Sequence, residues 1–293
     1  GGKYGADWTH SYVFKPAVVV RPANTQQVSE VVKLANAEKI TVVPMSGNTG
    51  LAGGTYAQGA LVLSLERLNT IREVRASCRI AVVEAGVILH NLHKAVDEHG
   101  LIFPMTFGAR GSAMLGGMLS TNAGGSNVLR YGNTRDLCLG LEVVLPSGEI
   151  MDLMSELHKD NSGYDLRHLM IGAEGTLGII TAAVLKLQPK PNAYATAMVA
   201  TGSLDEALLL LNSLQMATGG AVQAFEYMPK TYFEKYFKAF PKARQPFAKI
   251  YQHNIMVELG TTVKELFVPS AEGKIQLIHR LEGILEQEFE MGR

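Results

Sequence analysis

Short apolar runs alternate with amphipathic segments at the start of the chain. Within residues 16–75, strands are predicted from the apolar runs at 17–21, 41–44 and 60–65. Between the first two runs, apolar residues recur at helical spacing and predict a helix over 26–38, with Asn24 or Thr25 as its cap. This order of elements predicts a small α/β unit.

Residues 76–191 are predicted to form a second unit that is richer in strands. A helix is expected at 87–99, and strands are expected at 79–85, 141–145, 150–153 and 179–187. Pro146-Ser-Gly148 predicts a hairpin turn, and 179–187 is expected to alternate between its two faces. Pro189 and Pro191 mark the predicted domain boundary, because proline ends regular structure and stiffens a link.

The sequence pattern of residues 192–293 predicts a different kind of domain. Strands are expected at 194–200, 221–228 and 250–259, and helices at 203–217 and 229–240. Ser203 and Glu206 form a capping box for the first of these helices. A last helix is predicted from the apolar positions Ile275, Ile278, Leu281, Leu285 and Phe289. The pattern indicates a small α+β domain with a sheet covered on one face, and α+β is the fold class expected for the whole chain.

Three glycine-rich runs lie next to apolar segments in the sequence, at 45–54, 116–125 and 172–178. Glycine reaches positive φ without steric cost, so such loops can turn several backbone N–H groups onto one anion. Three of them in one domain predict a long, multiply phosphorylated ligand, most simply a nucleotide. The loops lack the lysine of a phosphate-binding P-loop, and the first has the wrong glycine spacing for a Rossmann fold.

Beyond these general features, Pro16 to Pro191 resembles the FAD-binding domain of the vanillyl-alcohol oxidase type. Ser46-Gly-Asn-Thr-Gly-Leu51 is similar to its pyrophosphate loop, and Asn122-Ala-Gly-Gly125 to its segment along the flavin. The runs 159–166 and 172–181 are similar to those of the D-lactate, glycolate and D-2-hydroxyglutarate dehydrogenase branch. The resemblance implies an FAD-binding domain over 1–191, with subdomains at about 16–75 and 76–191, and the first part of a cap domain over 192–293.

The resemblance also implies a set of cofactor-binding residues. They are Pro44, Ser46, Gly47, Asn48, Thr49, Gly50, Leu51, Gly54, Pro104, Gly111, Ser112, Gly116, Gly117, Ser120, Asn122, Gly124, Gly125, Tyr131, Gly132, Glu174, Gly175, Gly178, Ile179 and Ile180. Asn48 stands where covalent members of the family carry a histidine, so the FAD is expected to be noncovalent. Gly50 is expected to need an unusual φ and to lie too close to the pyrophosphate for a side chain.

Several of these residues keep a second interpretation. Glu174 could bond locally within its turn or contact the ligand, and Tyr131 could pack against the cofactor or fill the core. Tyr164 is interpreted as a core residue. His90 and His93 share a helix face, with His99 near its end, but a solvated face is a simpler account than a metal site. We predict no metal, and the sequence identifies no catalytic residue.

The resembled branch implies an oxidoreductase that oxidises a D-2-hydroxy acid to a 2-oxo acid by hydride transfer to flavin. Its His-rich, Gly-Asp-Gly-containing segment, which supplies a metal site and a catalytic histidine, has no counterpart between 192 and 293. The chain is therefore expected to be the amino-terminal part of such an enzyme. Two alternatives stay open: a noncatalytic FAD-binding module or truncated subunit that needs a partner, and a flavin oxidase or reductase with another substrate.

Net charge limits the classes of partner, and the cysteine content indicates a reducing compartment. Lys plus Arg equal Asp plus Glu, at 27 each, which argues against nucleic acid or anionic membrane as a partner. The two cysteines are expected to be reduced core residues on strands. No membrane span or secretory signal is recognised, so the expected location is cytoplasmic, or the mitochondrial matrix in a eukaryote. The expected partners are a small 2-hydroxy acid, an electron acceptor and, as one possibility, a second copy of the chain.

Overall fold

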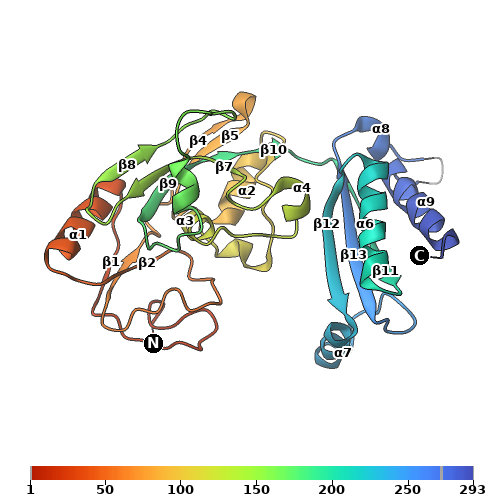
Figure 1. The fold of residues 1–293 in the computed structure, drawn as a ribbon, viewed down its shortest axis with the longest axis horizontal. Helices are drawn as coiled ribbons and strands as arrows, with labels where there is room; N and C mark the ends of the chain where they lie inside the picture. Colours follow the sequence, from red (N-terminus) through yellow and green to blue (C-terminus); the bar gives the residue numbers. More distant parts are fainter. Residues whose placement is uncertain (1, 271–272, 293) are drawn as a thin grey trace. The chain divides into compact units, whose positions relative to one another are not determined.

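The computed structural model describes residues 2–270 and 273–292. It divides into two compact units, which are drawn in sequence colours in Figure 1. The first unit comprises the chain up to Gly125 together with Gly132–Gln188. The second comprises Ser126–Tyr131 together with the chain from Pro189 onward. The short segment Ser126–Tyr131 therefore belongs with the last third of the chain, although its neighbours in sequence belong with the first.

A three-stranded parallel sheet begins the first unit, with the order β1-β3-β2. Its strands are β1 (Val18–Val20), β2 (Val42–Met45) and β3 (Leu61–Ser64). The helix α1 (Thr25–Ala37) starts at Asn24, whose side chain accepts a hydrogen bond from the Gln27 N–H and so caps the first turn. Val28, Val32 and Ala35 of this helix are buried, which confirms the predicted helical stripe.

A five-stranded antiparallel sheet completes the first unit, with the order β4-β5-β9-β7-β8. Its strands are β4 (Ile71–Arg75), β5 (Ile80–Glu84), β7 (Cys138–Val144), β8 (Ile150–Leu153) and β9 (Ile179–Lys186). Residues 71–75, assigned by the sequence to the first subdomain, thus pair with this second sheet. The expected alternation of β9 was wrong: Ile179 to Leu185 is buried throughout, because β9 is the middle strand and both of its faces are covered.

Short elements lie between and after the strands of the five-stranded sheet. They are η1 (Ala76–Cys78), α2 (Leu89–Asp97), β6 (Leu101–Ile102), η2 (Gly108–Gly111), α3 (Leu115–Ser120), α5 (Leu166–Met170) and β10 (Gln188–Pro189). Two of them, β6 and β10, pair with each other. Two sequence expectations fail here. Cys78 is exposed, because it lies on the η1 turn and not in a strand, whereas Cys138 is buried. Tyr164 is 96% exposed in the loop before α5 and is no core residue.

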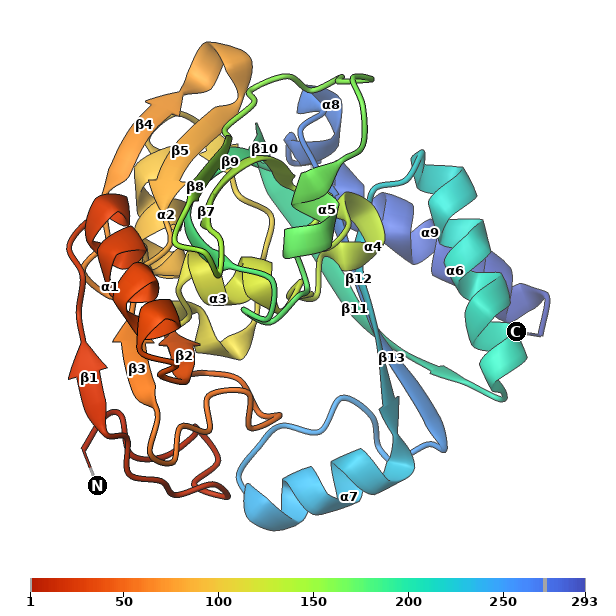
Figure 2. The same ribbon diagram turned by 60° about the vertical axis from the view of Figure 1, so that its left-hand side comes forward.

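The second unit is a three-stranded antiparallel sheet with the order β11-β13-β12. Its elements are α4 (Val128–Tyr131), β11 (Ala193–Thr201), α6 (Leu204–Thr218), β12 (Val222–Pro229), α7 (Lys230–Ala239), β13 (His253–Thr261), α8 (Lys264–Phe267) and α9 (Gln276–Glu290). Figures 1 and 2 show α6 and α9 on one face of the sheet. Leu210, Leu214, Leu277 and Leu281 from these helices join one core cluster with Val257 of the sheet.

Two details of this unit differ from the sequence prediction. In the capping box, the Ser203 Oγ accepts from the Glu206 N–H at 3.2 Å, but the Glu206 carboxylate accepts from Gly202, one residue before Ser203. In α9 the buried side chains include Leu277, Leu281 and Ile284. Of the apolar positions that predicted this helix, Ile275, Ile278 and Leu285 pack against the same core and are partly buried, whereas Phe289 is 82% exposed. The predicted positions therefore contribute to the core, apart from Phe289.

Candidate functional site

The first glycine loop follows β2 directly and leaves a row of backbone donors unused. In the part of the chain that the structure describes, the N–H groups of residues 47 to 51 make no hydrogen bond. Beside them the Ser46 Oγ is buried and has no partner among the described residues. Buried polar groups are normally satisfied, so the Ser46 Oγ needs a partner, and together with the neighbouring N–H groups it offers donors to an anionic ligand.

Asn48 fixes the shape of this loop. Its backbone is left-handed, with φ 50°, a conformation that asparagine tolerates better than most residues. The Asn48 Nδ2 donates to the Ala6 carbonyl at 2.8 Å, and its Oδ1 accepts from the Thr55 hydroxyl at 2.7 Å. Both polar atoms of the side chain are thus used to hold the loop to the N-terminal segment.

The second glycine loop lies against the first. A Cβ on Gly47 would come within 2.4 Å of the Ser112 carbonyl oxygen, so only glycine allows this approach. A Cβ on Gly117 would lie 3.2 Å from that of Ser46. The loops at 45–54 and 111–125 are therefore packed closely together, although Gly47 and Ser112 are more than sixty positions apart along the chain.

The third loop closes against both of the others. The Gly172 N–H donates to the Leu119 carbonyl at 3.0 Å, and the Glu174 N–H donates to the Ser120 carbonyl at 2.8 Å. A Cβ on Gly175 would lie 3.1 Å from the Pro44 ring, and one on Gly54 would lie 3.6 Å from the Glu174 carboxylate. The three runs that the sequence singled out therefore meet at one place in the first unit.

Arg135 links the second loop to the third. Its backbone N–H donates to the Asn122 Oδ1 at 3.0 Å. Its guanidinium donates to the His168 carbonyl at 2.5 Å and to the Ile171 carbonyl at 2.6 Å. A guanidinium holds two acceptors in a fixed geometry, so Arg135 fixes the distance between the loops. The sequence analysis did not identify this residue.

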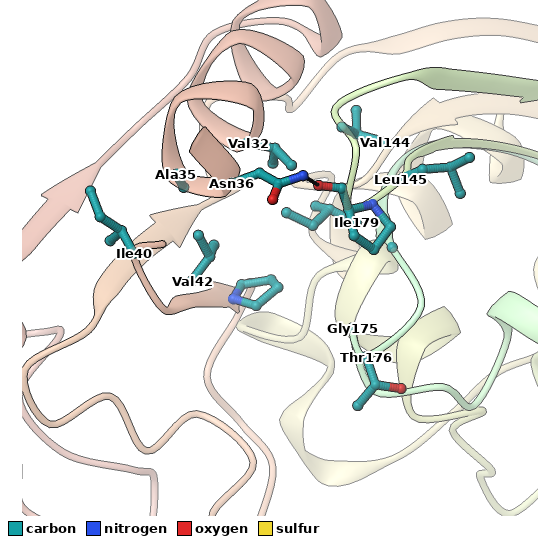
Figure 3. A pocket seen from close by; sticks show the side chains of 13 residues that line it. Val32, Ala35, Asn36, Ile40, Val42, Val144, Leu145, Gly175, Thr176 and Ile179 are labelled. Carbon is teal, nitrogen blue, oxygen red and sulfur yellow. Dashed lines mark hydrogen bonds between the residues drawn. The ribbon is translucent and has the colours of Figure 1, made fainter. Parts of the chain in front are cut away.

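A cavity of about 250 Å³ opens beside the meeting point of the loops. Figure 3 shows its lining, which comes from α1, β2, the β7–β8 turn and the start of β9. The lining residues are Val32, Ala35, Asn36, Ile40, Val42, Pro44, Val144, Leu145, Pro146, Gly175, Thr176, Gly178 and Ile179. Mostly aliphatic walls with a few polar groups are typical of a site for a flat, weakly polar ring.

Only four of these lining residues were among the predicted site residues: Pro44, Gly175, Gly178 and Ile179. The others come from α1, from the strands and from the hairpin turn. Their sequence signal was an apolar helix face, which also describes ordinary core. The side chain of Asn36, a polar residue beside that apolar face, was the available hint. Its Nδ2 donates to the Pro146 carbonyl at 3.1 Å.

The predicted site residues differ in how deeply they are buried. Pro104, Gly116 and Ile180 are buried in the first unit, and a Cβ on Gly116 would lie 2.7 Å from that of Ala85. That glycine is thus explained by packing between α3 and β5. Leu51, Gly111 and Ser112 are exposed. The expectation for Gly50 was wrong in part: its φ is not positive, and a Cβ there would meet no protein atom within 4 Å.

Tyr131 belongs to the second unit. Its hydroxyl accepts a hydrogen bond from the Gln223 Nε2 at 3.1 Å, and burial raises the pKa of this tyrosine above its usual value. Gly132, the next residue, belongs to the first unit and has φ 78°. Its glycine is required locally, because a Cβ would lie 2.4 Å from the Asp136 carboxylate.

The histidines of α2 have structural surroundings. The His93 Nε2 lies 3.0 Å from the Phe103 carbonyl oxygen, and burial lowers the pKa of His93. His90 is exposed, and His99 lies beyond the end of the helix. Within residues 2–270 and 273–292, no three His, Cys, Asp or Glu side chains gather as a metal site would require.

Comparisons with known proteins agree with this geometry. Residues 16–154 match the FAD binding domain family. This match includes the first two glycine loops. The chain is 42% identical over 258 residues to D-2-hydroxyglutarate dehydrogenase from Xanthomonas citri pv. viticola, covering 88% of this chain and 54% of the relative. It is 38% identical to the mitochondrial D-2-hydroxyglutarate dehydrogenase of Bos taurus, covering 76% and 41%.

Among solved structures, the fold is similar to that of an alkyldihydroxyacetonephosphate synthase, with a TM-score of 0.71. The match covers 93% of this chain and 50% of that structure at 19% identity, so it concerns the fold alone. The expected resemblance, FAD-binding fold and cofactor are thus confirmed. The chain spans about half the length of the curated relatives it matches. Among the described residues, no helix is long and apolar enough to cross a membrane.

The residues present fit an FAD. The Ser46 Oγ and the N–H groups of residues 47 to 51, which have no partner within residues 2–270 and 273–292, offer donors to a diphosphate. The cavity beside Pro44 offers apolar walls to a purine. The close approach of Gly47 to Ser112 brings the second loop alongside the first. One extended ligand that carries both a ring and phosphates would use all three features.

Proposed function

We propose that this chain supplies the FAD site of a dehydrogenase that oxidises D-2-hydroxy acids to 2-oxo acids, with D-2-hydroxyglutarate as the leading substrate. The meeting of three glycine loops at one point of the first unit carries the cofactor part of the proposal. The relatives, which are named D-2-hydroxyglutarate dehydrogenases, support the substrate class. A bound flavin supplies the acceptor for the hydride that leaves the carbon bearing the hydroxyl.

We assign different residues of the first unit to different parts of FAD. We assign the diphosphate to the Ser46 Oγ and the N–H groups of the first loop, where donors are free. The adenine is assigned to the cavity between α1 and the start of β9, whose walls are mainly aliphatic. The loops at 111–125 and 172–178 would extend the site along the rest of the cofactor. The other residues that the sequence analysis lists as cofactor-binding are also proposed to contact FAD.

The adenine assignment is tested by competition. FAD is titrated into the purified apo-chain in the presence and absence of AMP, with FMN and riboflavin as comparison ligands. We expect FAD to bind more tightly than FMN, and AMP to weaken FAD binding, because both would use the cavity. Equal affinity for FAD and FMN, with no effect of AMP, would show that the cavity takes no part.

Asn48 supports a noncovalent flavin, because it stands in the first loop where linked members of the family carry a histidine. Its amide nitrogen is also a poor nucleophile and is already bonded to Ala6. The flavin-loaded chain should release all of its FAD into the supernatant after acid precipitation. Yellow colour that stays with the precipitated protein would contradict this proposal.

The substrate class is tested with a chimera. The matched part of the Xanthomonas citri relative is replaced by this chain, and FAD loading is measured first as a control for folding. We expect the chimera to reduce a dye with D-2-hydroxyglutarate but not with its L-enantiomer, and D-lactate and glycolate serve as alternative substrates. A loaded chimera that reacts with none of these acids would overturn the proposed substrate class.

The partners and the location follow from the same proposal. Reduced flavin must pass its electrons on, so an electron acceptor is required, and a homodimer is one possible assembly. The names of the plant and animal relatives place those proteins in mitochondria. We propose the mitochondrial matrix for a eukaryotic source and the cytoplasm for a bacterial one. Fractionation of the source cells, followed by immunodetection of the protein, tests this location.

A further inference from the structure

Basic side chains are concentrated in one segment of the second unit, residues 230–251, which contains α7 and most of the loop that leads back to β13 (Figures 1 and 2). This segment has six lysines or arginines and one glutamate, whereas the whole chain has 27 residues of each sign. The basic residues are Lys230, Lys235, Lys238, Lys242, Arg244 and Lys249, and all are exposed. The zero net charge of the chain therefore does not describe this segment.

Most of these positive charges are not neutralised by the protein. Lys230 lies 3.7 Å from the carboxylate of Glu234, the only acidic residue of the segment. Within residues 2–270 and 273–292, the other five basic side chains form no ion pair, and the Lys249 Nζ lies 4.9 Å from the centre of the Tyr251 ring. The segment therefore presents a positive surface that attracts an anionic partner.

A row of aromatic side chains accompanies the charges. Tyr232, Tyr236 and Phe240 follow one another at a spacing of four residues, so they lie along one side of α7. They are 47%, 38% and 58% exposed. The inner side of the helix, which packs against β12, carries the buried Phe233 and the half-buried Phe237. Neighbouring exposed aromatic side chains are typical of an interaction surface, and a purely solvated helix face has no use for them.

The geometry of the outer row favours a lipid surface over nucleic acid. The rings of Tyr232 and Tyr236 are stacked, with centres 5.9 Å apart and planes at 14°. The Phe240 ring lies 5.1 Å from that of Tyr236 on the other side. Because these rings pack on one another, they offer few free faces on which bases could stack. Tyrosine combines an apolar ring with a polar hydroxyl, which suits the boundary between lipid and water.

We propose that residues 230–251 form a docking surface for a membrane with anionic lipids. The aromatic row enters the headgroup region, and the lysines and the arginine contact the anionic headgroups. Clusters of four to eight basic residues on or beside an amphipathic helix are typical of binding to such lipids. With ten residues, α7 has about half the length that a membrane span needs, so it lies along the surface. The proposal is independent of FAD binding, because all of these residues belong to the second unit.

Sedimentation with lipid vesicles tests the proposal. The purified 293-residue chain is mixed with vesicles of phosphatidylcholine alone, or of phosphatidylcholine and phosphatidylserine in an about three-to-one mixture. Both mixtures are measured at low ionic strength and at about 0.15 M salt. We expect binding to the phosphatidylserine vesicles only, and weaker binding at the higher salt because salt screens the basic side chains. Absence of binding to these vesicles at low ionic strength would overturn the proposal.

A pair of double variants tests the positive charges. Lys235→Gln/Lys238→Gln removes two charges from α7, and the matched control Lys15→Gln/Lys264→Gln removes two exposed lysines outside the segment. One basic residue near an anionic surface changes the affinity about fivefold, so we expect the first pair to lower the partition constant about 25-fold. The control should change it little. Equal losses in the two double variants would show that only net charge matters and would reject the docking surface.

A second comparison tests the aromatic row. Tyr236→Gln removes its middle ring, and Tyr164→Gln removes an exposed tyrosine of the first unit as the control. We expect Tyr236→Gln to weaken vesicle binding at both salt concentrations, because salt does not screen apolar contact. Binding as tight as that of Tyr164→Gln would contradict a role for the row. The thermal midpoint of every variant is measured, and Tyr232→Gln takes the place of Tyr236→Gln if the latter does not fold.

Two other partners would give different results. Tighter binding to single-stranded RNA than to the vesicles, lost in Lys235→Gln/Lys238→Gln, would assign the segment to nucleic acid. A dimer that Tyr236→Gln abolishes, without vesicle binding by the wild type, would assign it to a contact between two copies of the chain. Either result rejects the membrane proposal. FAD titration of the same variants separates this outcome from failure of the proposed function, because the cofactor loops lie in the first unit.

Discussion

Three residues of the site hold a backbone conformation that side chains usually avoid. Asn48, Asn122 and Glu174 have φ values of 50°, 48° and 52°, and one lies in each glycine loop. Such a conformation costs of the order of 1–3 kcal/mol and persists only where its surroundings hold it. Here Ala6 and Thr55 hold Asn48, the Arg135 N–H holds Asn122, and the Ser120 carbonyl holds Glu174. Their clustering supports a binding site at these loops.

Two glycines of the first loop should respond differently to a methyl group. Gly47→Ala places its Cβ against the Ser112 carbonyl at 2.4 Å, and overpacking of this kind costs about 1–3 kcal/mol. Gly50→Ala meets no protein atom within 4 Å. We expect urea unfolding to show a loss for the first variant and none for the second. Equal unfolding midpoints would contradict the close packing of the loops.

The variants at Gly47 and Gly50 also distinguish an effect on stability from an effect on FAD affinity. Because Gly50 has free space in the protein alone, any loss of FAD affinity in Gly50→Ala reports the ligand itself. Gly59→Ala serves as the control outside the loop, although its φ of 69° adds some local strain. We expect Gly50→Ala to bind FAD more weakly than Gly59→Ala. Equal affinities would place the diphosphate away from Gly50.

His93 makes stability depend on pH. Burial lowers the pKa of His93 below its ordinary value of 6.5, so the folded chain keeps this imidazole neutral while the unfolded chain binds a proton. The unfolding free energy should therefore fall as the pH drops below 6.5, until the pH reaches the lowered pKa of the folded state. Urea unfolding of His93→Gln and of the exposed control His90→Gln measures this. His93→Gln should show a flatter pH dependence than the control, and identical slopes would contradict the assignment.

At the scale of elements, periodicity identified most strands and helices but not how deeply each apolar position of a helix is buried. In α9 the predicted Ile275, Ile278 and Leu285 pack against the core and are only partly buried, and the predicted Phe289 is 82% exposed. Leu277 and Ile284 lie deeper. The sheet that this helix packs against decides which of its apolar positions lie deepest. That information lies in β11 and β13, not in the helix sequence.

The positions of the glycine loops along the sequence could not show that these loops meet in the folded chain. Loops 45–54 and 172–178 are joined through Pro44 and Gly175, and these residues are brought together by two different sheets. The resemblance to an FAD-binding domain singled out these loops, but not their contacts. The cavity walls from α1 were missed because an apolar helix face looks the same in a core as beside a ligand.

Arg135 offers a test at this scale, because it joins α5 and the third loop to the second loop. Arg135→Ala would leave the His168 and Ile171 carbonyls without their donor, and hydrogen bonds to charged groups are worth about 1.5–3 kcal/mol each. We expect a loss of about 2 kcal/mol in unfolding free energy and weaker FAD binding. Arg67→Ala is the matched control, since Arg67 also donates to a backbone carbonyl, that of Arg21. A control that loses as much FAD affinity would reject the role of Arg135.

At the scale of the whole molecule, the chain contains the three glycine loops and a small second unit. The loops belong to the first unit. The second unit is built from a single three-stranded sheet with α6 and α9 on one face. Since the curated relatives are about twice as long as the matched region, binding and turnover need not be supplied by the same part of the protein.

We therefore expect the 293-residue chain to bind FAD but to show little dehydrogenase activity. Removal of the hydroxyl proton needs a base within hydrogen-bond reach of the substrate, and the three glycine loops contain no histidine. Elsewhere, the His93 ring lies against the Phe103 carbonyl, and the His253 Nδ1 lies 3.1 Å from the Tyr227 hydroxyl. These histidines have structural partners already.

The measurement is dye reduction by the FAD-loaded chain with D-2-hydroxyglutarate, D-lactate and glycolate, with the chimera as the positive control. FAD content is determined for both proteins, so that an empty site is not mistaken for an inactive one. We expect the chimera to exceed the chain by at least about a hundredfold, the lower range of what a positioned base contributes. Comparable turnover by the chain alone would mean that its own residues complete the active site. The base would then have to be sought among the carboxylates and tyrosines of the two units.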